Sequence, residues 1–152
     1  MNADTKLQLL KDEYLLLQRI YEDFDSRALT IKGWSATVGI AAIGVGFYQS
    51  SYLWLFAAGS SVVFWFLEGL WKSFQYCHGT RIVRLEKAFS DDNFENIAPL
   101  QIYTSWANSW SRRQVFAVLG ATIVDLPHSL TALIGITLFV MQHVFKVPLS
   151  PH

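Results

Sequence analysis

Two long apolar runs, separated by only three residues, constrain the fold of this chain more than any other feature. Residues 34–48 carry no charged side chain, and residues 52–71 carry only Glu68. A helix rises about 1.5 Å per residue and the hydrocarbon core of a bilayer is about 30 Å thick, so runs of this order cross it, the shorter one with flanking residues. We predict two transmembrane helices, residues 33–49 and 52–72, joined by a tight turn.

The composition indicates a single all-α membrane domain. Hydrophobic residues make up 52% of the 152 residues and charged residues 16%, against about 25% in soluble proteins. Twelve basic and twelve acidic residues balance, so no basic field attracts nucleic acid. Cys77 is the only cysteine, which excludes an internal disulfide and a multi-cysteine metal site. Phosphate-loop, zinc-protease and hydrolase motifs are missing, so we expect a protein that is not an enzyme and has no cofactor.

Amphipathic helical patterns continue both runs away from their turn. Apolar side chains recur at spacings of three and four in residues 4–32 and again in residues 73–89. We therefore predict a long αα-hairpin with legs on the order of 60 Å, spans at one end and two cytoplasmic arms at the other. The apolar stripe of the first arm packs on its own chain or, alternatively, forms an intermolecular coiled coil. This stripe consists of Leu7, Leu10, Tyr14, Leu17, Tyr21, Phe24, Ala28 and Ile31.

Glu68 is the one carboxylate in the second run, and the hairpin supplies it with basic neighbours. With the turn centred near Ser50, residues whose numbers sum to about 100 lie level, which places Lys32 opposite Glu68. Lys72 lies four residues beyond Glu68 on the same helix. A carboxylate at the edge of a membrane is costly unless it is paired or hydrated. We predict a structural ion pair among Lys32, Glu68 and Lys72; the alternative is a functional ion or proton site.

Small residues line one face of the first span. They repeat at the same spacing of three and four, and such stripes mark close contacts between membrane helices. We expect this face to pack within the hairpin; an oligomer seam or a pore lining is the alternative. The seam comprises Ser35, Gly39, Ala42 and Gly46.

Residues 90–124 form the predicted cytoplasmic linker. It opens with an acidic, turn-rich stretch and continues with a short amphipathic helix near residues 100–110. Tyr103, Trp106 and Trp110 share one face of that helix. Since Tyr and Trp favour the headgroup layer, this helix lies on the membrane or, equally, packs against the arms.

The sequence DLPH at residues 125–128 begins the predicted third span, residues 126–145. Asp125 would cap the helix and Pro127 would lie in its first turn, where a missing N–H costs nothing. The alternative is one kinked span from residue 115 to 145 with DLPH at mid-depth. Because ionisable groups inside a membrane are functional candidates by default, we name Glu68, Asp125 and His128 as a candidate ion or proton pathway. The alternative for Asp125 and His128 is a helix cap and an interface histidine.

Basic residues predict the orientation, because they flank both spans and are missing from the turn between them. Arg27 and Lys32 precede the first span, while Lys72, Arg81 and Arg84 follow the second. Basic flanks stay in the cytoplasm. We expect a cytoplasmic N-terminus and, after three spans, an extracytoplasmic C-terminus.

Three segments resemble a group of small bacterial membrane proteins with no assigned activity. They are YEDFD at residues 21–25, LTIKGW at 29–34 and LEGLWKSFQY at 67–76, and LPH at 126–128 is also similar. The resemblance implies a location in the bacterial inner membrane. More distantly, the layout is similar to the SLATT-type two-span effectors of bacterial conflict systems, which are held to disrupt membranes when a partner senses a signal.

These observations favour a membrane protein that assembles with copies of itself. The arms and the small-residue seam would form the contacts, and the assembly would act as a pore or ion-conducting effector in the lipid bilayer. One alternative is an anchor or adaptor that recruits a cytoplasmic protein. Another is an intramembrane proton or ion carrier that uses the three candidate residues.

Overall fold

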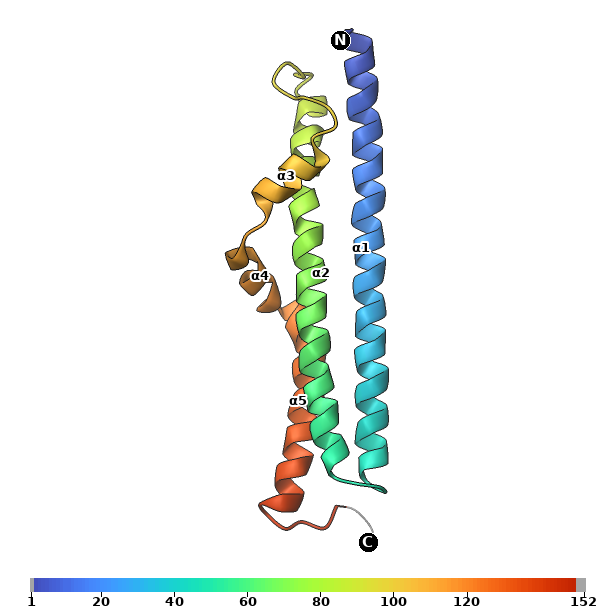
Figure 1. Ribbon diagram of the computed structural model, residues 1–152, viewed down its shortest axis with the longest axis vertical. Coiled ribbons are helices and arrows are strands. Elements are labelled where there is room, and N and C mark those ends of the chain that lie inside the picture. Colours follow the sequence, from blue (N-terminus) through green and yellow to red (C-terminus); the bar gives the residue numbers. More distant parts are fainter. Residues whose placement is uncertain (1, 150–152) are drawn as a thin grey trace.

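The computed structural model describes residues 2–149, which form five helices and an all-α fold (Figure 1). The helices are α1 (Ala3–Gly46), α2 (Tyr52–Ser90), α3 (Ile102–Ser109), α4 (Arg112–Leu119) and α5 (Thr122–His143). α1 and α2 form a long antiparallel hairpin, and α5 packs mainly against the half of α2 that follows the turn. The predicted fold class is confirmed, since α1, α2 and α5 are long and apolar enough to cross a membrane.

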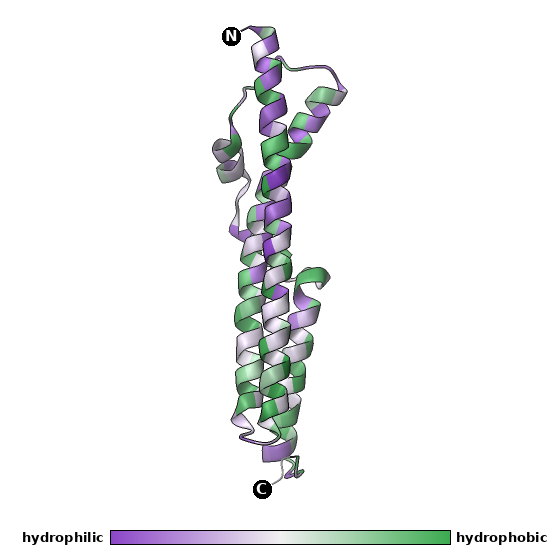
Figure 2. Cartoon of the chain, turned by 90° about the vertical axis from the view of Figure 1, so that its right-hand side faces the viewer, coloured by the Kyte–Doolittle hydropathy of each residue, from purple (hydrophilic) through white to green (hydrophobic). Residues whose placement is uncertain are grey.

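α1 is a single helix of 44 residues, about 66 Å long at 1.5 Å per residue. The Asn2 side chain accepts a hydrogen bond from the Asp4 N–H at 3.3 Å and so caps the first turn. Gly33 lies inside the helix without interrupting it. Figure 2 shows that hydrophobic residues dominate the half of the hairpin near the turn, while hydrophilic residues concentrate in the other half.

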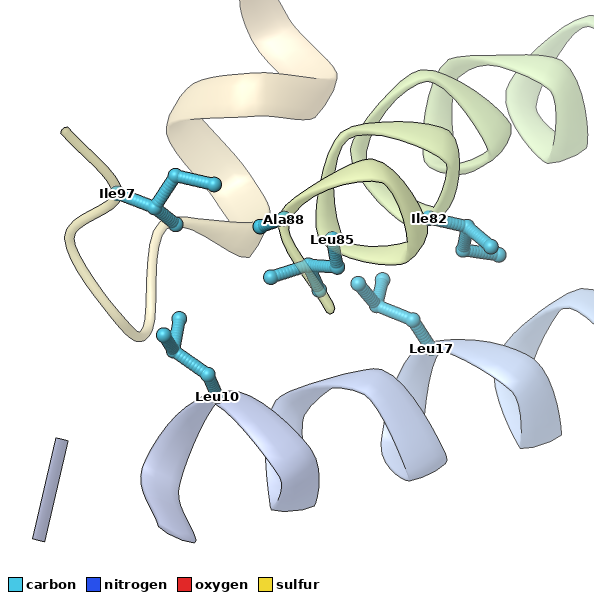
Figure 3. Close-up of a cluster of buried hydrophobic side chains, with 6 residues drawn as sticks. All are labelled: Leu10, Leu17, Ile82, Leu85, Ala88 and Ile97. Atoms are coloured by element: carbon cyan, nitrogen blue, oxygen red, sulfur yellow. The ribbon is translucent and has the colours of Figure 1, made fainter. Parts of the chain in front are cut away.

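The two arms pack against each other through a buried apolar cluster (Figure 3). Leu10 and Leu17 of α1 are fully buried, and they meet Leu85 of α2. Ile82, Ala88 and Ile97 complete the cluster. The second arm of the same chain thus covers Leu10 and Leu17 of the apolar stripe, while Leu7 remains exposed.

The small-residue seam of α1 is also covered by its own chain. A Cβ atom on Gly39 would overlap the Thr131 side chain of α5, and one on Gly46 would overlap the Trp54 ring of α2. Ser35 contacts α5 as well, through His128. The seam therefore packs against α5 in addition to the hairpin partner α2.

The third span starts four residues earlier than the DLPH sequence predicted. α5 begins at Thr122, with Ala121 in an extended conformation at the N-cap, and Asp125 lies in the first turn rather than capping it. A single span from residue 115 does not form either, because Gly120 and Ala121 interrupt the helix between α4 and α5. The carbonyl of Ala121 accepts the N–H groups of Val124 and Asp125, both at 2.9 Å, and so provides the helix start.

The helix predicted near residues 100–110 is α3, and it packs against the second arm. Trp106 contacts the Phe74 ring with centroids 5.7 Å apart, whereas Tyr103 remains 78% exposed. At the other end of the linker, a Cβ on Gly69 would overlap Leu119 of α4, and the Trp65 indole donates to the Leu119 carbonyl at 3.0 Å. These contacts hold the linker along α2, just above the start of α5.

Candidate functional site

Four polar side chains from three helices meet inside the bundle. Lys32 and Ser35 come from α1, Glu68 from α2 and His128 from α5. Glu68 is 0% exposed and His128 and Ser35 are each 2% exposed. Glu68 lies about 24 Å along α2 from Tyr52.

His128 bridges α1 and α2 with its two ring nitrogens. Its Nε2 lies 2.9 Å from Glu68 Oε2, and its Nδ1 lies 2.8 Å from Ser35 Oγ. A carboxylate only accepts hydrogen bonds, so a neutral imidazole donates from Nε2–H to Glu68, and the Ser35 hydroxyl donates to Nδ1. Every polar atom of the imidazole is satisfied in this arrangement, as a buried polar group requires.

Lys32 compensates the charge of Glu68. Its Nζ lies 3.1 Å from Glu68 Oε1, within ion-pair distance. The contact is not aligned as a hydrogen bond. The ammonium donates a hydrogen bond of 2.8 Å to the Ile123 carbonyl of α5. A buried carboxylate without a counter-charge costs several kcal/mol, so this pair makes the site tolerable in apolar surroundings.

Pro127 explains why the Ile123 carbonyl is free to accept from Lys32. Pro127 lies inside α5, four residues after Ile123, and has no N–H to donate to that carbonyl. The Lys32 ammonium supplies the missing donor. The proline therefore creates the acceptor through which α1 binds the first turns of α5.

A small pocket of about 190 Å³ opens beside His128 in the groove between α2 and α5. Asp125 lies in its wall, three residues before His128 and so on the same face of α5. Ser61 also lines it, and the fully buried Ser61 Oγ has no hydrogen-bond partner within the described chain. The lining residues are Ser61, Val62, Trp65, Asp125, His128, Ser129 and Ala132.

The structure thus brings Glu68 and His128 into direct contact and places Asp125 in the wall of the adjoining pocket. Lys72 differs from the prediction, since it forms its ion pair with Asp25 of α1 rather than with Glu68. Four residues advance a helix by about 400°, so Lys72 is rotated about 40° from Glu68, and there it meets Asp25. The Lys72 ammonium holds the pKa of the Asp25 carboxyl below its ordinary value.

Sequence reasoning missed a second buried ion pair, between the arms. Arg81 Nε and Nη2 donate to the two oxygens of Glu13 at 2.9 and 3.0 Å, and both side chains are at most 3% exposed. The spacing carried a signal, since Glu13 lies between Leu10 and Leu17 at intervals of three and four, on the buried stripe.

The site has the parts of a hydrogen-bond relay. A serine, a histidine and a glutamate in line also occur in hydrolases, where the imidazole activates the hydroxyl. Here Ser35 is buried and lies outside the lining of the pocket, so its Oγ does not face a space that a substrate enters. The arrangement is suited to holding or moving a proton.

The chain matches no protein-family model, no curated protein and no solved structure.

Proposed function

We propose that this protein is an integral membrane protein in which the Glu68–His128 pair binds and releases a proton, and that this step controls how α5 docks on the hairpin. The observation that carries the proposal is the fully buried Glu68 carboxylate, 2.9 Å from a buried imidazole on another helix. Intramembrane ionisable groups are rare and expensive, and they commonly mark proton pathways.

The pair accommodates two protonation states without losing a partner. When His128 gains a proton, both ring nitrogens become donors. Ser35 Oγ, at 2.8 Å, is able to accept from Nδ1 after its hydroxyl hydrogen rotates. The hydroxyl then donates to a carbonyl one turn earlier in α1, as serines in helices do. The network therefore changes its charge with a rotation of one hydroxyl.

Protonation of His128 would also change how strongly Lys32 interacts with Glu68. In the neutral state, Lys32 provides the only full positive charge among the four side chains of the site. A charged His128 competes with Lys32 for the carboxylate and repels the ammonium. Since Lys32 also binds the Ile123 carbonyl, weakening its position loosens the contact between α1 and α5. We propose that the proton reaches His128 through the pocket beside Asp125.

We further place both arms in the cytoplasm of a bacterial cell and the α1–α2 turn outside its inner membrane. The basic residues that flank the spans support this orientation, because Lys and Arg near span ends remain inside. His128 then lies near the cytoplasmic edge of the bilayer. The protein would respond to the pH of the cytoplasm.

A distance measurement tests the proton step. Labels on Val45→Cys of α1 and Ile136→Cys of α5, in a Cys77→Ser chain in nanodiscs, report how close the two helices lie. We expect the distance to increase reversibly as the pH is lowered and the Glu68–His128 pair takes up a proton. His128→Gln should remove the change, while His143→Gln, which replaces an exposed imidazole on the same helix, should preserve it. A transition that persists in His128→Gln would overturn the proposal.

A second candidate function, self-assembly through the arms, is favoured by an apolar groove on the hairpin. The groove has a volume of about 550 Å³ and is lined by Lys11, Tyr14, Leu15, Glu86 and Phe89. Leu15 is 54% exposed. A second copy related by a two-fold axis would place its Glu86 near Lys11 and its Lys11 near Glu86, so the groove is self-complementary in charge.

The size of the protein in detergent tests this second candidate. Leu15→Glu places a charge in the groove and should convert a dimer to a monomer, measured by light scattering. Val83→Glu is the control, because Val83 is 63% exposed on the second arm of the same hairpin but does not line the groove. A wild-type protein that is already monomeric would exclude assembly through the arms.

A further inference from the structure

A third cavity, unrelated to the Glu68 site, lies between α2, the loop that follows it and α3. It has a volume of about 350 Å³, within the range of small-molecule sites. We call it the polar groove. Its lining residues are Thr80, Arg81, Arg84, Asn96, Ala98, Gln101, Thr104, Ser105, Asn108 and Ser109.

The side chains of the polar groove form a set of hydrogen-bonding groups with positive charge. Nine of the ten lining residues carry a polar side chain, and two are arginines, while none of the ten is acidic. Arg81 is neutralised by Glu13. Arg84 has an exposed side chain and, within the described residues, donates one hydrogen bond, of 3.3 Å, to the Asn96 carbonyl. Most of the five N–H donors of Arg84 are therefore available for an anion.

The wall of the groove is held in a fixed shape. Leu100 has φ of 61°, a conformation that residues with a side chain seldom adopt. Its N–H donates to Glu13 Oε2 at 2.9 Å, and Arg81 donates to the Ala98 carbonyl at 2.8 Å. The buried ion pair thus fixes the loop at the rim. Strained backbone that the surrounding structure enforces is typical of ligand-binding loops.

Helix α3 turns its two faces to different partners. Trp106 packs on Phe74 of α2, whereas Thr104, Ser105 and Asn108 line the groove. Hydroxyls and amides at these positions suit the hydroxyl groups of a sugar or another polyol. A guanidinium suits a phosphate group, with which it forms paired charge-assisted hydrogen bonds.

The distance of the groove from the apolar run of α2 favours a soluble ligand over a lipid. Trp71 ends the apolar run of α2, and Thr80 and Arg84 lie about 14 and 20 Å farther along the helix. The headgroup layer on each side of a bilayer is only roughly 5 to 8 Å thick. The groove therefore lies beyond the headgroups. We propose that the polar groove binds a small soluble molecule that carries a phosphate group on a hydroxyl-rich body, with Arg84 as the anion contact.

Binding to the full chain in nanodiscs tests this proposal. The probes are inorganic phosphate and AMP, at millimolar concentrations, measured by calorimetry. We expect AMP to bind and phosphate to compete with it. Arg84→Gln should weaken AMP binding roughly tenfold or more, the value of a lost charge-assisted contact. Lys87→Gln should leave binding unchanged, since Lys87 is exposed on the same helix but does not line the groove.

Three results would overturn the proposal. One is equal loss of binding in both variants, which would indicate a general charge effect. Another is binding of neither probe. The third is binding only to vesicles of anionic phospholipid, sensitive to Arg84→Gln, which would assign the groove to a lipid phosphate instead of a soluble one.

Discussion

At Gly135, α5 comes close to the backbone of α2. A Cβ atom there would overlap the carbonyl oxygen of Trp54 and lie 3.4 Å from the Ala58 nitrogen. Backbone atoms of a helix cannot rotate away as a side chain can. The absence of a side chain at this position therefore permits the contact, as small residues do between membrane helices.

Substitution of Gly135 should therefore separate α5 from the hairpin. We expect Gly135→Ala to lower stability by about 1–3 kcal/mol, the usual cost of overpacking, measured by thermal unfolding in detergent. Gly59→Ala is the matched control, because a Cβ on Gly59 meets nothing within 4 Å. Its stability should be unchanged or higher by up to about 1 kcal/mol, since Ala favours helix. Equal losses in both variants would contradict the close approach.

Individual contacts were predictable where the hairpin alone determines them. Counting from the turn placed Lys32 opposite Glu68, and Lys32 Nζ lies 3.1 Å from Glu68 Oε1. The spacing of four residues assigned Lys72 to Glu68, but spacing within one helix could not show that Lys72 faces Asp25 of α1 instead. The contact of Ser35 with His128 depends on where α5 docks, and no spacing within either helix records that position.

At the scale of elements, the Glu13–Arg81 pair joins three parts of the chain. It connects α1 to α2 with two hydrogen bonds, and each partner also binds the loop before α3. Removal of one partner leaves a buried charge with unsatisfied neighbours, while replacement of both by apolar residues removes that cost.

A double-mutant cycle should show this coupling. We expect Arg81→Met alone to destabilise the protein by about 3–5 kcal/mol, and Glu13→Leu with Arg81→Met to recover most of that loss. Denaturant unfolding monitored by circular dichroism measures both. Additive losses would show that the two side chains act independently. Because Leu100 loses its partner in the double variant, the loop should become more mobile even where stability recovers.

The boundaries of α5 show what local sequence rules omit. Asp125 and Pro127 together satisfy the rules for a helix start, yet α5 begins at Thr122. Proline is tolerated at the sixth residue of this helix because Lys32, 95 positions earlier in the chain, donates to the carbonyl that Pro127 leaves free. A rule based on neighbours in sequence has no means of including that donor.

At the scale of the whole molecule, the α1–α2 turn and the end of α5 lie at the same end of the bundle (Figure 1). In a Cys77→Ser chain, Gln49→Cys and Lys146→Cys should therefore react with a membrane-impermeant maleimide from the same side. Asn93→Cys, in the loop after α2, should react only after the membrane is permeabilised, if the arms are cytoplasmic. Labelling of Gln49→Cys and Lys146→Cys from opposite sides would contradict the arrangement of the three spans.

The overall architecture was predictable because it follows from lengths and periods. Uncharged runs of span length gave the hairpin, and the repeat in the arms gave its extension beyond the membrane. The packing of α5 across the small-residue seam was not predictable, since the stripe from Ser35 to Gly46 fits equally a neighbour in the same chain or in another. Only the three-dimensional arrangement distinguishes these partners.

The continuity of α1 has a mechanical consequence. A helix about 66 Å long, without a break between Ala3 and Gly46, behaves as a lever. A tilt of about 5° around the end near the turn displaces the opposite end by about 6 Å. Lys32 lies along this lever, where its contact with α5 is made. Because Leu10 and Leu17 pack the amino-terminal half of α1 on α2, a change in that polar contact would reach the amino terminus as a displacement of several ångströms only when the two arms tilt together.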